Sequence, residues 1–255
     1  MALKRITPTS ADRICALLIG PAGIGKTSQL RCLLGQDYRN GQWEQQTDLQ
    51  PERVLTVSAE SGLLCVSELV RSGSVEGFEV HSLSEFKEVL QFCGTQEFKD
   101  AGFKWIFIDS LTEIAARCVE ELQKKYPSKA DGFKMWGEYS QTMTDIIKSF
   151  RDMPNVNVVF TCLVSVDKDD IGRRHLVPDI SGSGLKTRLP SYFDEVFFMD
   201  RQQMVTGGTA EAPVTENVLV FNTSEPIGIA KDRSGKLRPQ EYPNLLMCRN
   251  KILAQ

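Results

Sequence analysis

The pattern of apolar and polar positions alternates between short apolar runs and longer stretches with helical spacing. Four apolar runs are typical of strands buried inside a parallel sheet: 13–19, 53–58, 105–109 and 157–161. A shorter strand is expected near 78–81. Because these runs are separated by polar turns and by segments with helical periodicity, the first two thirds of the chain predict repeated strand–helix units.

Helices are predicted between these runs. One begins near Lys26, and another follows a cap at Ser84. Beyond Ser110, apolar residues recur on one stripe, and Ser110 with Glu113 has the spacing of a capping box. The helix at 136–150 carries aromatic residues at the same spacing, which we interpret as core rather than as a stacking surface.

The last third of the chain changes character, because short strand-like pieces replace the strand–helix alternation. They lie at 195–199, 218–222 and 227–230, and some are expected to be antiparallel. Polar, turn-rich residues predict a loop or small excursion at 35–52 and a loop at 165–185. The pattern therefore predicts an α/β fold with a mostly parallel central sheet, helices on both faces and some antiparallel C-terminal strands.

Length and composition fit one soluble globular domain. With 255 residues, 41% of them hydrophobic and 25% charged, we expect a polar lead at 1–12 and a single domain at 13–255. The net charge of −3 disfavours a general attraction to nucleic acid. No segment has the apolar length of a signal peptide or a membrane span, so a cytoplasmic protein without a membrane partner is expected.

The cysteines and histidines narrow the chemistry further. The seven cysteines are isolated, without a C-x-x-C pair, and are expected to be buried thiols in a reducing compartment. The two histidines, His81 and His175, lie far apart in sequence. The sequence therefore disfavours a zinc site and a histidine-based catalytic triad.

One motif has the spacing G-x-x-x-x-G-K-[ST] and lies between the first strand and the first helix. Its residues are Gly20, Pro21, Ala22, Gly23, Ile24, Gly25, Lys26 and Thr27. The glycines let backbone N–H groups curl around a polyphosphate, Lys26 reaches the terminal phosphates, and Thr27 offers its hydroxyl to Mg²⁺. Ser28 follows at the start of the helix, where unpaired N–H groups favour negative charge. The motif therefore predicts a phosphate-binding loop.

Nucleotide hydrolysis also needs a metal ligand, a group that orients water, and positive charge. Asp109 ends an apolar strand, where a carboxylate can hold Mg²⁺; an acid favoured by a helix start is the alternative. Glu60 follows the strand at 53–58 and can activate the attacking water, or it only favours a helix N-terminus. Thr161 ends its strand and can sense the γ-phosphate, or it is an ordinary β-branched strand residue.

This order of motifs resembles the ATPase core shared by RecA, DnaB-type helicases and KaiC. The resemblance spans roughly residues 13–240. Segments at 176–182, 194–196 and 230–235 look most like compact phage-encoded RecA-like ATPases, some of which act as single-strand annealing proteins. The resemblance implies ATP as the nucleotide, Mg²⁺ as its metal, and the cytoplasm of a bacterial host as the location if the chain is phage-encoded.

The K-x-R-x-G form at 231–235 resembles the segment with which DnaB-like and RadA-like proteins reach the ATP of a neighbouring subunit. By that resemblance, Lys231 and Arg233 are catalytic residues that act in trans, as an arginine finger does. A ring or filament of this chain, with ATP at the subunit interfaces, follows from such a role. A basic turn on the surface is the alternative.

RecA-like proteins hold DNA with two loops, and the matching stretches here are 124–134 and 167–188. Four lysines and one aspartate leave the first stretch with a net charge of +3, while five basic and four acidic residues leave the second with +1. Tyr126 and Phe133 can stack on bases, or they are incidental aromatics in a solvated loop. The electrostatic footprint for single-stranded DNA is therefore weak.

Three functions remain open at this stage. The first is an ATP-hydrolysing oligomer that acts on single-stranded DNA in recombination or annealing. The second is a motor or regulator of the DnaB or KaiC type with a protein partner. The third is a small-molecule kinase with Arg173 and Arg174 as lid arginines, for which no acceptor site is evident. GTPase signalling is disfavoured, because the sequence has no N-K-x-D motif.

Overall fold

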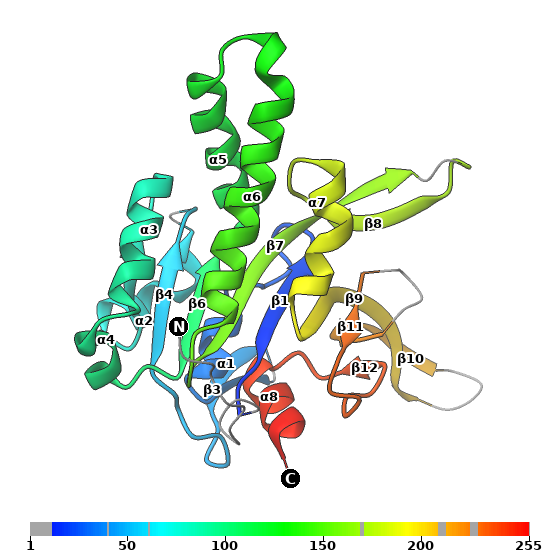
Figure 1. Ribbon diagram of the computed structural model, residues 1–255. Helices are drawn as coiled ribbons and strands as arrows, with labels where there is room; N and C mark the ends of the chain where they lie inside the picture. The colour runs from blue at the N-terminus through cyan, green and yellow to red at the C-terminus, as the bar shows by residue number, and fades with distance from the viewer. Residues whose placement is uncertain are drawn as a thin grey trace.

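The structure is a computed structural model, and it contains one large sheet covered by helices on both faces (Figure 1). The residues that it describes are 12–39, 41–60, 62–168, 171–208, 213–224 and 229–254. The predicted polar lead at 1–12 therefore lies almost entirely outside the described residues. So does half of the strand expected at 227–230, whose described half is not a strand.

Six parallel strands form the centre of the sheet, in the order β9-β1-β7-β6-β4-β5. Their bounds are β1 Cys15–Gly20, β4 Val54–Ser58, β5 Glu76–Glu79, β6 Trp105–Asp109, β7 Asn157–Lys168 and β9 Glu195–Gly208. Every residue of β1, β4 and β6 is buried, as expected for strands covered on both faces. Because the strands are parallel, their carboxyl ends meet at one edge, and the phosphate loop, Glu60, Asp109 and Thr161 lie at that edge.

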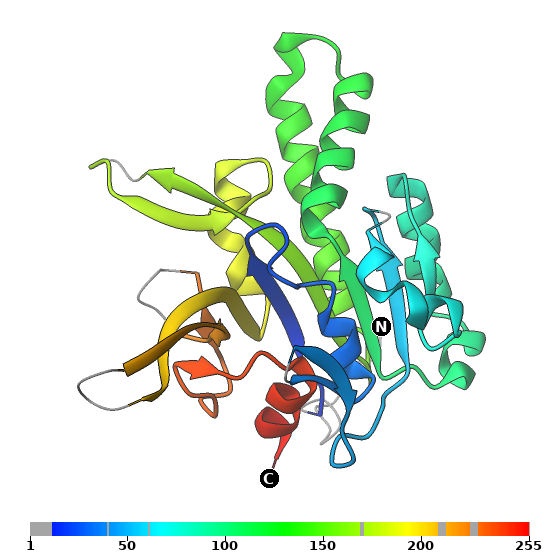
Figure 2. The ribbon, with the colours of Figure 1, turned by 180° about the vertical axis from the view of Figure 1, so that it is seen from behind.

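Shorter antiparallel strands extend the sheet on both the β9 and the β7 sides. They are β8 Arg174–Pro178 on β7, β10 Pro213–Asn222 and β11 Lys231–Asp232 on β9, and β12 Gln240–Glu241 on β10. A separate hairpin of β2 Gln36–Arg39 and β3 Gln42–Gln45 lies beside the C-terminal helix (Figure 2). The predicted α/β fold with a mostly parallel sheet and antiparallel C-terminal strands is confirmed.

The alternation of side chains along β1 divides the core into two clusters, one on each face of the sheet. Cys15, Leu17 and Ile19 point into the larger cluster, and Ala16 and Leu18 into the smaller one. The larger cluster is covered by α3 Leu83–Phe92, α4 Gln96–Ala101, α5 Leu111–Lys125, α6 Gly132–Arg151 and α7 Ser183–Arg188. The smaller one is covered by α1 Gln29–Leu33, α2 Ser67–Arg71 and α8 Leu245–Leu253.

Two projections rise above the carboxyl edge of the sheet. The paired helices α5 and α6 extend well beyond it, and the ribbon of β7 and β8 leans out beside them (Figure 1). The first six residues of β7 are buried and its last three are exposed, so one strand runs from the core into solvent. Two aromatic residues of α6, Tyr139 and Phe150, are core as predicted, whereas Trp136 is 43% exposed.

Several element predictions were wrong in detail. The cap of α3 is Ser82 and not Ser84, because Ser82 Oγ accepts a hydrogen bond of 3.2 Å from the N–H of Glu85. The stretch at 165–185 is not a loop, since residues 165–168 belong to β7, Arg174–Pro178 form β8 and α7 begins at Ser183. Helix α1 begins at Gln29, three residues after Lys26, because turns occupy the intervening positions. Six of the seven cysteines are buried; Cys65 is exposed.

Candidate nucleotide site

The glycine-rich loop leaves the carboxyl end of β1 in the conformation that its glycines permit. Gly23 and Gly25 have φ angles of 71° and 107°, a region that other residues rarely adopt. At Gly20 the constraint is space, because a Cβ atom there would lie 2.6 Å from the carbonyl oxygen of Met199 on β9. The loop is therefore held against β9 by close backbone contact.

Lys26 curls back over its own loop. Its Nζ donates to the carbonyl oxygens of Gly20 at 3.0 Å and Pro21 at 2.8 Å, and its side chain is buried. Burial lowers the pKa of Lys26, an effect opposed by the nearby carboxylates of Asp109 and Glu60. A phosphate oxygen is a charged and therefore stronger acceptor than a carbonyl, so a bound phosphate would replace these contacts.

Asp109 sits between two hydroxyl groups at the end of β6. Thr27 Oγ1 donates to Asp109 Oδ2 at 2.6 Å, and Thr161 Oγ1 donates to Asp109 Oδ1. Burial raises the pKa of Asp109, while the hydrogen bonds from Thr161 and Thr27 lower it. The structure thus brings together the predicted metal ligands, Thr27 and Asp109, and places the predicted phosphate sensor Thr161 on the same carboxylate.

These residues fit a magnesium ion. A hydroxyl and a carboxylate are hard oxygen donors of the kind that Mg²⁺ prefers, and phosphate oxygens and water supply its remaining ligands in P-loop proteins. Within the described residues, no group of three or more His, Cys, Asp or Glu side chains could hold a metal by itself. The pair of Thr27 and Asp109 would therefore hold the ion only together with a nucleotide.

Glu60 is exposed at the end of β4, one strand away from Asp109. Ser110 Oγ donates to Glu60 Oε1 and also accepts from the N–H of Glu113 at 3.3 Å, so the predicted cap at Ser110 is present. The ends of the two strands are joined because the N–H of Ala59 donates to the carbonyl oxygen of Asp109 at 2.7 Å. This arrangement holds a carboxylate beside the phosphate loop without burying it.

Sequence reasoning missed two residues that position Glu60. Ser110 was considered only as a helix cap, and its bond to Glu60 depends on β4 and β6 being neighbours, which no local pattern reveals. Arg117 on α5 donates to the carbonyl oxygens of Ala59 and His81, both at 2.9 Å. Its spacing of four residues from Glu113, with which it forms an ion pair of 3.0 Å, indicated only a helix-surface pair.

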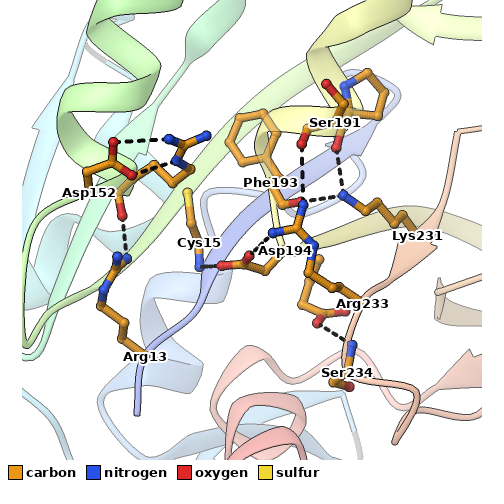
Figure 3. Close-up of polar contacts among 12 residues, drawn as sticks. Arg13, Cys15, Asp152, Ser191, Phe193, Asp194, Lys231, Arg233 and Ser234 are labelled. Carbon is orange, nitrogen blue, oxygen red and sulfur yellow. Dashed lines mark hydrogen bonds and ion pairs between the residues drawn. The ribbon is translucent and has the colours of Figure 1, made fainter. Parts of the chain in front are cut away.

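Lys231 and Arg233 lie away from this site, at the opposite end of β1 (Figure 3). Lys231 Nζ donates to the carbonyl oxygen of Phe193 at 2.6 Å, and Arg233 Nη1 contacts Asp194 Oδ1 at 2.6 Å. The other oxygen of Asp194 accepts from the N–H of Cys15, the first residue of β1, at 3.0 Å. The length of β1, roughly 16 Å from Cys15 to Gly20, separates them from the loop of their own chain.

A phosphate loop after a buried parallel strand, facing a threonine on the neighbouring strand β7 and an aspartate on β6 beyond it, is characteristic of α/β P-loop NTPases, and this protein is one of that class. The chain belongs to the AAA domain family. The model of that family matches residues 12–234, which include every site residue described above. Membership in this family makes the protein an ATPase by class, with nucleotide as its ligand.

A search of curated proteins found no match to this chain. Over the residues that the structure describes, none of the helices is both long enough and apolar enough to span a membrane.

Proposed function

We propose that this AAA domain is a RecA-like, magnesium-dependent ATPase that assembles into a ring or filament and acts on single-stranded DNA in recombination or annealing. The observation that carries the proposal is the position of Lys231 and Arg233 at the far end of β1 from their own phosphate loop. From this position, neither residue can reach ATP that is bound to the phosphate loop of its own chain. Their K-x-R-x-G spacing resembles a segment that acts on the ATP of a neighbouring subunit.

The strand order supports the RecA-like part of the proposal. Strand β7, with Thr161, lies between β1 and β6, and β4 lies beyond β6. The phosphate loop, the sensing threonine, the metal-binding aspartate and the acid after β4 are therefore side by side along one edge. This is the arrangement expected if all four act on one triphosphate.

The residues of this chain divide the work of hydrolysis. The loop holds the phosphates, with Lys26 on the terminal ones, while Thr27 and Asp109 hold Mg²⁺. The ion, when bound, neutralises charge on the phosphate oxygens. Glu60, oriented by Ser110, accepts a proton from the attacking water. Arg233 from the next subunit supplies the positive charge that the transition state needs.

The two projections are the proposed DNA-binding elements. Residues 124–134 form the tip of the α5–α6 pair, where Phe133 is 97% exposed. Within the described part of the chain, Lys124 and Lys129 have no ion-pair partner, whereas Lys125 is paired with Glu138. The segment 167–188 includes the last residues of β7 and all of β8, on the ribbon beside them. Free lysines and an exposed aromatic ring are the groups that bind phosphates and stack on bases.

A protein partner is the second candidate, and exposed apolar side chains on the same projections favour it. Val166 is 62% exposed and Ile171 is 73% exposed on the β7–β8 ribbon. Tyr126, a candidate for base stacking, instead donates its hydroxyl to Glu138 at 2.7 Å. A motor or regulator of the DnaB or KaiC type would use this surface to grip protein.

The experiment that separates the two candidates is ATP turnover with and without single-stranded DNA. We expect turnover to rise when DNA is added and to be lost in Lys26→Ala, because that lysine is the only one in the loop. A matched control is Lys99→Ala on α4, which should turn over like the wild type. Turnover that is indifferent to DNA at every concentration tested would contradict the DNA proposal and leave the protein-partner candidate standing.

A further inference from the structure

A cavity of about 590 Å³ lies beside the phosphate loop, on the flank of β1 that faces β9 and β10. Gly23, Gly25 and Ser28 of the loop form one wall. The others come from the β2–β3 hairpin, the β9–β10 ribbon and Tyr242. Its volume is within the range of roughly 300–1,000 Å³ that small-molecule sites occupy. The cavity is therefore continuous with the loop and large enough for a small ligand.

Three aromatic side chains line this cavity, and two of them, Tyr38 and Tyr242, are exposed. On the hairpin, the ring centroids of Tyr38 and Trp43 lie 5.3 Å apart and their ring planes make an angle of 60°. Tyr38 is 53% exposed. Tyr242 is 44% exposed and donates its hydroxyl to the carbonyl oxygen of Tyr38 at 3.1 Å. Exposed aromatic faces around a hollow are suited to stacking against a flat ring.

The strand order determines which part of a nucleotide would reach the cavity. Thr161, Asp109 and Glu60 all lie on one flank of β1, on or just after strands β7, β6 and β4. The cavity lies on the other flank, toward β9 and β10. Since the terminal phosphate must face the carboxylates, the opposite end of the nucleotide leaves the loop toward the cavity.

We propose that this cavity binds the nucleoside part of ATP, with the base stacked on Tyr38 and Trp43 of the β2–β3 hairpin. The inference rests on the proposed function, because it assumes a triphosphate in the loop. Asn217 and Glu216 of β10 line the same cavity and offer an amide and a carboxylate to the hydroxyl groups of the ribose or the edge of the base. Met199 and Leu219 provide apolar contact.

The walls of the cavity are fixed to the loop by a buried side chain. Gln29, the first residue of α1, donates from Nε2 to the carbonyl oxygen of Pro243 at 2.8 Å and accepts at Oε1 from the N–H of Leu245 at 3.1 Å. Asn244 Nδ2 then donates to the carbonyl oxygen of Gln36 on the hairpin at 3.4 Å. Loop, hairpin and Tyr242 are thus held in one arrangement before a ligand arrives, which favours binding.

The test compares ATP with inorganic tripolyphosphate, which has phosphates but no nucleoside, by calorimetry on the full chain with Mg²⁺. We expect Tyr38→Ala and Trp43→Ala each to weaken ATP binding by about 5-fold to 100-fold, as loss of a stacking ring does. Tripolyphosphate binding should stay as in the wild type. Lys26→Ala should weaken both ligands. The matched control is Trp136→Ala, which removes a half-exposed tryptophan on α6.

A second measurement uses conservative variants, which protects the test against misfolding. ATP should quench tryptophan fluorescence in the wild type and in Trp136→Phe, and the quench should be lost in Trp43→Phe while ATP affinity is kept. Unchanged ATP affinity in both alanine variants, with binding lost in Lys26→Ala, would overturn the base site and spare the ATPase proposal. Equal losses for ATP and tripolyphosphate would also overturn it. A wild type that binds neither ligand would overturn both proposals.

Discussion

At the scale of single residues, Asp109 and Glu60 have opposite environments although they lie at the ends of neighbouring strands. Asp109 is buried, and both of its oxygens accept from threonine hydroxyls. Glu60 is exposed and has one oxygen free of the contact with Ser110. A carboxylate enclosed by hydroxyls suits a metal, whereas an open one suits proton transfer with water.

Glu60→Gln should therefore separate binding from chemistry. The amide keeps a polar contact with Ser110 but cannot accept a proton, so turnover should fall by about 10²-fold to 10⁴-fold while ATP affinity stays close to that of the wild type. Single-turnover hydrolysis and calorimetry measure the two quantities. Glu97→Gln, on the exposed surface of α4, is the control. If turnover survives in Glu60→Gln, Glu60 has no catalytic role.

Glu195 gives a residue-scale prediction about pH. Burial, together with the neighbouring Asp232, raises the pKa of Glu195 to about 8, and Asp232 is itself held ionised by hydrogen bonds from Ser234, Gly235 and Leu237. Because the folded state keeps a proton that the unfolded chain loses near pH 4.3, the contribution of Glu195 to stability falls as pH rises from about 4.3 to about 8.

Glu195→Gln should remove this dependence, since an amide does not titrate. Relative to the wild type, the variant should be more stable at pH 8.5 than at pH 5, as measured by urea denaturation at each pH. The same control variant, Glu97→Gln, should follow the wild type at both values. A stability difference that does not change with pH would show that Glu195 is not protonated in the folded protein.

At the scale of elements, the sequence correctly predicted the strands that are buried and missed the strands that are exposed. The strands at 105–109 and 157–161 were correct, because a strand buried on both faces must be apolar throughout. The continuation of β7 to Lys168 and its return as β8 were taken for a loop, because an exposed ribbon carries no burial pattern. The β2–β3 hairpin was taken for a loop or small excursion for the same reason.

In the candidate site, too, some features could be predicted from the sequence and others could not. The phosphate loop and Asp109 were recognisable, because their chemistry is local and follows one strand each. The contact of Ser110 with Glu60 and the cavity between the hairpin and β10 depend on segments far apart in the chain, so neither could be predicted from spacing.

The tip of the α5–α6 pair gives a prediction at this scale. Replacing Lys124 and Lys129 together by alanine should weaken binding to single-stranded DNA and reduce the slope of log K against log salt by about 1.4, or about 0.7 for each lost phosphate contact. Titration of a labelled oligonucleotide at several salt concentrations measures both. Lys99→Ala and Lys104→Ala, introduced together, are the control pair. An unchanged slope would remove this tip from the DNA-binding surface.

At the scale of the whole molecule, our proposal makes the two ends of β1 half-sites that cannot serve each other within one chain. A subunit with Arg233→Ala should lose about 10³-fold to 10⁵-fold in turnover, the range measured for an arginine finger. A subunit with Lys26→Ala should be inactive as well. Mixing the two should restore turnover, because the intact loop of one meets the intact arginine of the other.

The mixing experiment needs two controls. Arg238→Ala, at an exposed residue near the same turn, should be active without being mixed with a second variant. Sedimentation with and without ATP should show assembly under the conditions of the assay. Two inactive variants that stay inactive when mixed, although they co-assemble, would contradict a role for Arg233 in trans.

The contact between Arg233 and Asp194 has a consequence for how readily such an assembly forms. The arginine side chain is 54% exposed, and ion pairs of this kind contribute only about 0.2–1 kcal/mol. By Boltzmann weighting, Arg233 is away from Asp194 for roughly one sixth to two fifths of the time. In the proposed assembly, a neighbouring subunit would meet an arginine that is already detached in a sizeable fraction of encounters, so breaking this pair would not limit the speed of assembly.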